Sequence, residues 1–324
     1  MDVNAIFQMV PNILQGALKV GLADALVVLA LFLSYSMLNV CDLSTDGCYT
    51  LGALVGTLVA MAGHPWLSIP AAMLAGAASG LVTAVLQTKM GVQSLLAGIV
   101  VNTGMYSVNM ALSGFRPNLA MPSTGKLRVE TIFTKAYDFL KAHAPQLTDY
   151  SIILVLLMFV TLVVLFLIFF LRTKLGLAIR ATGSNADMVR SSSINPAFTT
   201  IVGLCVSNSF TALSGCLFAQ QTKSYNVNMG GGIVTVALAS LLIGGVIFGK
   251  HRAIPLRALG AVLGAFIFRL VYSIALQIPN AVYMVNAISS IIVIIAISGP
   301  YLKERFGIQM KRWRTGKEGG EAAC

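Results

Sequence analysis

Charged residues are scarce in this sequence. Asp, Glu, Lys and Arg make up only 10% of its 324 residues, whereas a soluble domain carries about 25%. Hydrophobic residues account for 57%, and the mean hydropathy is +0.84. The shortage of charge excludes an ordinary soluble domain, and it predicts an integral membrane protein that crosses the bilayer several times.

Catalytic and metal-binding motifs are also missing. The five cysteines form no C-x-x-C pair and there are only three histidines, so neither a metal site nor a disulfide framework is predicted. The sequence contains no H-E-x-x-H, no G-x-S-x-G and no P-loop. We therefore expect no enzyme, no catalytic residue and no directly bound cofactor. Energy for active transport would have to come from an ion gradient or from another subunit.

Long apolar segments are what the sequence does contain. Most reach the ~20 residues that a helix needs to cross the hydrocarbon core. They predict an all-α transmembrane domain over residues 1–300, followed by a basic tail over 301–324. Three Gly-x-x-x-Gly pairs, which begin at Gly52, Gly76 and Gly260, predict close helix packing within the bundle. The nine segments lie at about 20–40, 49–63, 67–88, 94–112, 150–171, 197–219, 231–249, 255–277 and 281–299.

Basic residues are distributed unevenly between the loops. Segment 172–196 carries four basic residues against the single acid Asp187, and short basic loops face the cytoplasm. With this loop inside, 14 of the 22 basic residues fall in cytoplasmic segments and seven fall outside. This predicts nine spans with the N-terminus outside and the C-terminus inside. Orientation and anionic lipid headgroups then explain the net charge of +11 better than nucleic acid does.

The connection over residues 113–149 is the one sizeable outer segment that this topology predicts. Residues 130–143 fit an amphipathic helix, with Ile132, Phe133 and Phe139 among the apolar residues of one face. Such a helix can lie on the rim of the bundle, or it can form a contact surface for an external partner, and both interpretations stay open.

A weak internal repeat divides the chain into two halves. Each half reads as one apolar segment, a broken glycine-containing stretch, and three further segments. The stretches share a pattern, with Gly47-Cys48-Tyr49-Thr50 matching Gly232-Ile233-Val234-Thr235. Because the first half begins out-to-in and the second in-to-out, the halves are expected to have inverted topology, with a pathway between them.

Polar residues interrupt the apolar segments between the first two spans. Non-helical backbone at membrane depth has to be buried in protein or line a water-filled cavity. Helix capping is one interpretation of Ser44, Thr45 and Asp46, and it fits Asp46 best. A pathway lining is the other, and we carry Asp42, Ser44 and Thr45 as pathway candidates.

Single polar residues also fall inside predicted spans. Asn102, Asn109 and Ser113 share one helix face, where they could join helices or line a pathway. We carry Asn102 and Asn109 as pathway candidates. Asp24, near the start of the first segment, is expected to be interfacial. Arg269, inside the eighth, is expected either to reach the outer surface or to pair with a carboxylate.

The 172–196 loop carries the most specific pattern. Residues 172–185 read RTKLGLAIRATGSN, which resembles the R-T-x-x-G-x-A-I-R-A-x-G-x-N loop of ABC importer permeases of the branched-chain amino acid and ribose type. Asp42-Leu43-Ser44 is similar to that family's D-L-S-x-G stretch, and residues 229–245 resemble its second glycine-rich signature. The resemblance covers about Gly21 to Pro300. Val189 and Ser193 stand where the family has Ala and Gly, which suggests a docking surface fitted to one particular ATPase.

The resemblance implies a coupling helix at about residues 184–192, docked in a separate cytoplasmic ATPase that binds ATP and Mg²⁺. It also implies a homodimer, an external substrate-binding protein and a location in the bacterial inner membrane. The substrate would be a small polar solute, most simply an amino acid, and the Asp46 variant resembles permeases for aromatic amino acids. The residues assigned to ATPase coupling are Arg180, Gly183, Ser184, Asn185, Asp187, Arg190 and Ile194.

Two alternatives stay open. Sugars and nucleosides also suit permeases of this type. A self-contained, ion-coupled secondary transporter would use Asp24, Asp42 and Arg269 as ion or proton sites.

Overall fold

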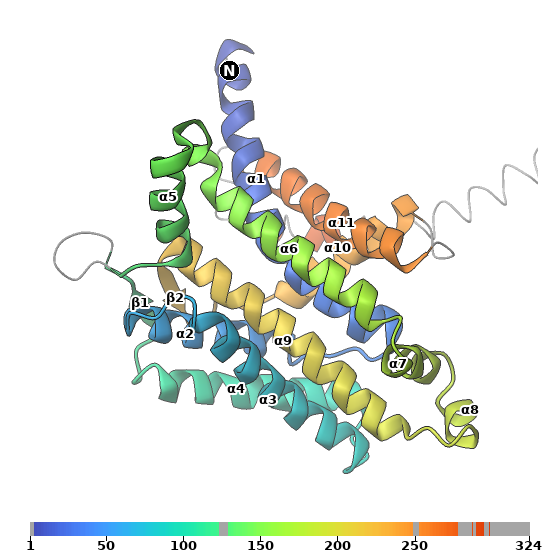
Figure 1. The fold of residues 1–324 in the computed structure, drawn as a ribbon. Helices are drawn as coiled ribbons and strands as arrows, with labels where there is room; N and C mark the ends of the chain where they lie inside the picture. The colour runs from blue at the N-terminus through green and yellow to red at the C-terminus, as the bar shows by residue number, and fades with distance from the viewer. Residues whose placement is uncertain are drawn as a thin grey trace, which may run out of the picture.

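The computed structural model describes residues 3–122, 129–248, 253–277, 287, 290–294 and 298. These residues are almost entirely helical, which confirms the all-α prediction (Figure 1). The elements are α1 (Val3–Leu31), the π-helix η1 (Phe32–Met37), α2 (Thr45–Met61), α3 (Ser68–Thr88), α4 (Ser94–Leu112), β1 (Asn118–Ala120), α5 (Ile132–His143), the 3-10 helix η2 (Pro145–Tyr150), α6 (Ser151–Phe170), α7 (Lys174–Ser184), α8 (Ala186–Ser191), α9 (Pro196–Thr222), β2 (Ser224–Asn226), α10 (Ile233–Phe248) and α11 (Ile254–Ala275).

Six helical segments in the described residues are long and apolar enough to cross a membrane. Two further helices, α2 and α10, are shorter at 17 and 16 residues and follow the two broken stretches. The predicted ninth segment, 281–299, and the basic tail, 301–324, lie largely or wholly outside the described residues. The six spanning segments are Ile13–Met37, Ser68–Thr88, Ser94–Leu112, Pro145–Phe170, Pro196–Thr222 and Ile254–Ala275.

Helix α1 forms the centre of the bundle. Every residue from Ala23 to Leu33 is at most 2% exposed, as expected for a helix that is apolar on all sides and is surrounded by other helices. It contacts α6, α9, α10 and α11. Figure 1 shows α9 between α6 and the α2–α3 pair, with α5 and the strands at one end of the bundle and α7 and α8 at the other.

Glycines allow the closest helix crossings. A Cβ on Gly52 of α2 would lie 2.1 Å from the Ala212 carbonyl oxygen of α9, and a Cβ on Gly76 of α3 would lie 2.4 Å from that of Asn208. A Cβ on Gly264 of α11 would lie 2.0 Å from the Ser240 carbonyl oxygen of α10. The expectation that the Gly-x-x-x-Gly pairs pack helices within one bundle is therefore confirmed.

The position predicted for Asp24 is wrong. The first spanning segment begins at Ile13 rather than near residue 20, so Asp24 lies near its middle and is 1% exposed instead of interfacial. Its carboxylate pairs with the Arg269 guanidinium of α11. A buried charge needs an opposite partner, and this pair answers the question left open for Arg269.

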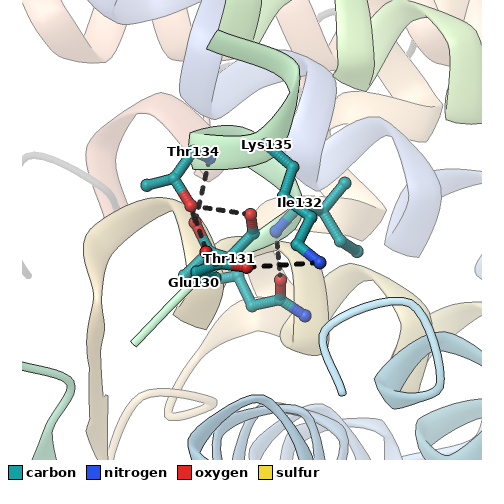
Figure 2. Close-up of polar contacts among 6 residues, drawn as sticks. Glu130, Thr131, Ile132, Thr134 and Lys135 are labelled. Carbon is teal, nitrogen blue, oxygen red and sulfur yellow. Dashed lines mark hydrogen bonds and ion pairs between the residues drawn. The ribbon is translucent and has the colours of Figure 1, made fainter. Parts of the chain in front are cut away.

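Helix α5 forms where the outer connection was expected to be amphipathic. Its N-cap, Thr131, and Thr134 form a reciprocal capping box, and the backbone N–H of Ile132 donates to the Gln220 side chain of α9 (Figure 2). Ile132 and Phe133 are buried, but Phe139 is 63% exposed. The first turn of the predicted apolar face is therefore buried, whereas Phe139 near the end of the helix is exposed.

Two short strands tie the same connection to the end of α9. β1 and β2 are antiparallel, with Leu119 opposite Tyr225. Tyr225 is 1% exposed and packs among residues of α2 and α9.

Candidate functional site

The 172–196 loop folds into two short helices, α7 and α8, and each start is capped by a side chain. Thr173 accepts a hydrogen bond from the Gly176 N–H at the start of α7. Asn185 accepts from the N–H groups of Asp187 and Met188 at the start of α8, at 3.1 and 3.0 Å. Asn185 is therefore the N-cap of α8. Ser184 instead ends α7, where its hydroxyl donates to the Ala181 carbonyl.

Helix α7 packs against η1 and the start of α9. A Cβ on Gly183 would lie 2.1 Å from the Met37 carbonyl oxygen, so no larger residue fits there without a shift of the backbone. The hydroxyls of Thr182 and Thr199, in α7 and α9, are 2.8 Å apart and hydrogen-bonded. Ile179 is fully buried. The loop is thus a packed structure fixed to two membrane helices.

Helix α8 projects from the bundle and exposes most of its side chains. Met188 is 69% exposed, and Asp187 and Arg190 form a solvent-exposed ion pair at 3.8 Å. An exposed pair of this kind contributes little stability, so both groups are available to a partner. Ile194, just beyond the helix, is 36% exposed. The loop residues assigned from the sequence therefore lie together, although their role in coupling stays a prediction.

The two departures from the family pattern have different structural meanings. Val189 is 4% exposed, so it does not lie on the exposed side of α8. The interpretation that this departure fits α8 to one particular ATPase stays a prediction. Ser193 has φ of 61°, in the left-handed region where glycine is at ease and other residues are strained. The backbone conformation at this position thus explains why the family pattern has glycine there.

The predicted pathway residues gather around the start of α2. The Asp42 carboxylate accepts from the Ser44 N–H and hydroxyl through one oxygen and from the Asn208 amide of α9 through the other, at 2.6–2.8 Å. The Thr45 hydroxyl donates to the Asp42 carbonyl. All three candidates are at most 2% exposed, so this stretch is buried in protein, and a role in transport stays a prediction.

Asp46 caps a helix other than the one expected. Its carboxylate accepts from the N–H groups of Gly232 and Val234, at 3.0 and 2.9 Å, and these groups belong to the start of α10. The Gly230 N–H donates to the Thr50 hydroxyl beside it. The two broken stretches therefore meet, and the first supplies the helix cap of the second. Ser44, at the N-cap of α2, makes no side-chain cap.

Helix α4 packs against the start of α2 through two asparagine side chains. The Asn109 amide donates to the Gly47 carbonyl at 3.2 Å, and a Cβ on Gly47 would lie 2.8 Å from Asn102 Oδ1. Asn109 and Ser113 are buried and Asn102 is half-buried. The predicted polar face of this helix is therefore real, and it lies against the start of α2.

Two buried polar residues, Asn208 and Tyr225, were not assigned to a site from the sequence. Asn208 lies within the predicted 197–219 segment, but nothing in the sequence pairs it with Asp42. Tyr225 is buried and its hydroxyl has no hydrogen-bond partner within the described structure. Burial raises the pKa of this phenol to about 12. The only sequence signal for Tyr225 was its place just beyond an apolar segment.

A cavity beside α7 brings together two basic residues that are far apart in the sequence. It has a volume of about 440 Å³ and is lined in part by Arg180 of α7 and Arg257 of α11. Arg257 lies near the start of the predicted 255–277 segment, and its nearness to the 172–196 loop could not be read from the sequence.

Comparison with known proteins gives a consistent result. Residues 13–297 match the family model described as "Branched-chain amino acid transport system / permease component". The chain is 30% identical to a tyrosine transport system permease protein of Clostridioides difficile, over 83% of this chain and 85% of that protein. It is 31% identical to an uncharacterised protein of Rickettsia prowazekii, over 82% and 89% of the two chains.

A more distant relative is named for a different substrate. The chain is 27% identical to a guanosine ABC transporter permease protein of Bacillus subtilis, over 81% of this chain and 83% of that protein. No solved structure matches the chain. The family match spans nearly all of the helical bundle, the chain's helices are long enough to cross a membrane, and the loop between α6 and α9 carries the family's ordered motif. The chain therefore belongs to the branched-chain amino acid permease family, and it is a multi-pass permease component of an ABC importer in the bacterial inner membrane.

Proposed function

We propose that α8 is the coupling helix, which docks in a groove of a separate cytoplasmic ATPase. The observation that carries this proposal is the contrast between the two loop helices. α7 is packed through Gly183 against the end of the first span, whereas α8 exposes Met188, Asp187 and Arg190. A rigid base with an exposed tip suits the transfer of movement from a partner to the bundle. The ATPase binds ATP and Mg²⁺, and the permease itself binds neither.

The proposed architecture has nine spans in two halves of inverted topology. The direct contact of the two broken stretches at Asp46, Thr50 and Gly230 supports it, because corresponding elements of inverted repeats meet at the interface between the two halves. The N-terminus lies outside and the C-terminus inside, which puts α8 in the cytoplasm and α5 at the outer surface. Two copies of the chain form a homodimer with the pathway at its centre.

The proposed substrate is an amino acid with an aromatic side chain, delivered by an external substrate-binding protein. The 30% identity to a tyrosine transport permease supports this choice. A nucleoside is the second candidate, because a guanosine permease is also related, at 27% identity. A sugar is the third, on the family resemblance alone. The exposed surface of α5 around Phe139, which is 63% exposed, is the proposed contact for the binding protein.

Reconstitution tests the proposal directly. The permease, its ATPase and its binding protein are placed in proteoliposomes, and uptake of labelled tyrosine, guanosine and ribose is compared with and without ATP. We expect uptake only with all three proteins and ATP, and a preference for tyrosine. A thermal-shift screen of the binding protein identifies the substrate independently.

The same assay tests the ion-coupled alternative. Uptake driven by a sodium or proton gradient with the permease alone would refute the ATPase-coupled proposal. The carboxylates that this alternative requires are already engaged in the structure, since Asp24 pairs with Arg269 and Asp42 binds Asn208.

A further inference from the structure

The cavity beside α7 has the volume and lining of a small ligand site. Its volume of about 440 Å³ lies within the range of ligand pockets in proteins. Three elements contribute to it: the end of the first span, α7 and the start of α11. Its polar lining consists of Arg180, Arg257, Ser36 and Ser184, and its apolar lining includes Met37 and Leu177.

The charge of this cavity is unbalanced. The Arg257 guanidinium donates to the Ser36 hydroxyl at 2.6 Å and lies over the Phe32 ring, with 5.6 Å from its central carbon to the ring centroid. Arg180 is exposed. Within the described residues, neither arginine forms an ion pair with a carboxylate. Within the described part of the chain, Arg257 is therefore held in place by neutral groups, and no carboxylate there balances its charge.

The remaining donors favour an anion with several oxygens. A guanidinium presents five N–H donors and binds phosphate and carboxylate in a two-pronged geometry. Arg257 uses one of these donors on Ser36, and Arg180 faces the same space from another helix. Arg257 also lies in the first turn of α11, where the helix dipole favours negative charge.

The position of the cavity suggests where the anion comes from. Met37 ends one spanning segment and α11 begins another at Ile254, so the cavity lies at the end of two membrane helices, at the depth of lipid headgroups. Leu177 is 52% exposed at its rim and offers an apolar surface to a glycerol backbone or acyl chain. That this end faces the cytoplasm rests on the proposed function.

We propose that the cavity between η1, α7 and α11 binds a phosphate group, held by Arg180 and Arg257, and that the phosphate belongs to an anionic lipid. The bound headgroup would join the base of the coupling loop to the start of α11. A free phosphate ion shares this chemistry and is separated from lipid by the experiment below.

The test uses the full-length permease purified in neutral detergent. Native mass spectrometry measures binding of phosphatidylglycerol and of phosphatidylcholine, which also carries a phosphate but has no net charge. Thermal shift measures inorganic phosphate against chloride at equal ionic strength. The variants are Arg257→Gln, Arg180→Gln and the charge-keeping Arg257→Lys. Arg172→Gln is the matched control, because Arg172 is exposed in the same loop but does not line the cavity.

We expect wild-type permease to prefer phosphatidylglycerol. Arg257→Gln should weaken that binding about tenfold, in line with the loss of hydrogen bonds to a charged group. Arg180→Gln should weaken it severalfold, Arg257→Lys should recover most of it, and Arg172→Gln should change it less than about twofold. Stabilisation by millimolar inorganic phosphate that Arg257→Gln abolishes would support the anion site with free phosphate as its source.

Three results would overturn the proposal: equal binding of the two lipids with no response to phosphate, an equal loss in Arg172→Gln and Arg257→Gln, or an effect of Arg257→Gln on ATPase binding alone. The last result would assign the cavity to an acidic side chain of the ATPase. These binding measurements need neither ATP nor substrate, so a failed uptake assay would refute the proposed function without deciding this site.

Discussion

Replacing Asp46 tests whether one half of the bundle caps a helix of the other. Its carboxylate accepts the N–H groups of Gly232 and Val234 at 3.0 and 2.9 Å. Loss of an N-terminal cap costs about 1 kcal/mol, and loss of a partly buried negative charge at a helix N-terminus costs about another 1 kcal/mol. We expect Asp46→Ala to lower the free energy of local opening at the start of α10 by about 2 kcal/mol.

Hydrogen exchange of the purified permease measures this opening directly. Because 1.4 kcal/mol corresponds to a factor of ten, peptides from the start of α10 should exchange about 30-fold faster in Asp46→Ala. Asp46→Asn keeps one acceptor oxygen but loses the charge and the second acceptor, so its effect should be about half as large in free energy. Asp149→Ala is the control, because Asp149 is exposed in η2.

The distribution of the effect decides the outcome. Faster exchange at the start of α2, with α10 unchanged, would mean that Asp46 caps its own helix. That result would refute the contact between the two broken stretches and, with it, the main support for two facing halves.

Three further predictions concern packing and strain. Gly183→Val places side-chain atoms where a Cβ alone would be 2.1 Å from the Met37 carbonyl oxygen. It should destabilise the protein by about 1–3 kcal/mol and reduce ATP-dependent uptake. Unchanged thermal stability would contradict the packing of α7. Ser193→Gly removes a side chain from a left-handed backbone (φ 61°) and should raise stability by up to about 1 kcal/mol, so a lower melting temperature would argue against that conformation. Arg269→Met leaves the buried Asp24 carboxylate unpaired and should lower the free energy of unfolding by about 3–5 kcal/mol. Adding Asp24→Leu should recover most of this loss. A double variant no more stable than Arg269→Met would show that the unpaired carboxylate is not the source of the loss.

Much of the fold follows from local properties of the sequence. Eight of the nine predicted apolar segments coincide with described helices, because an apolar run of this length has few other stable forms in a membrane. The capped helix of the 172–196 loop was also predictable, since Asn185 lies directly before a short helical segment. The start of the first helix was not, because α1 extends well before the apolar run, to Val3.

Long-range partners could not be read from the sequence. Asp46 and Val234 are 188 residues apart, and a carboxylate just before a helix looks locally like the cap of that helix. Asp24 and Arg269 pose the same problem, since each charge needed a partner but neither sequence context named it. Glycine spacing predicted close crossings, yet only the fold shows that α2 and α3 both approach α9.

Packed residues connect the 172–196 loop to the start of α10 through the short segment between Met37 and Asp46. Gly183 of α7 packs against the backbone of Met37 and Leu38. Four residues further along the chain, Asp42 is hydrogen-bonded to Asn208, and Asp46, four residues after that, caps α10. A displacement of α7 by a docked partner therefore acts on the residues that join the first span to α2, and these hold the start of α10. Packed elements pass on such shifts when they have two discrete arrangements. Hydrogen exchange of Gly183→Val examines this path: faster exchange at α10 as well as at α7 would connect the two sites, whereas an effect confined to α7 would separate them.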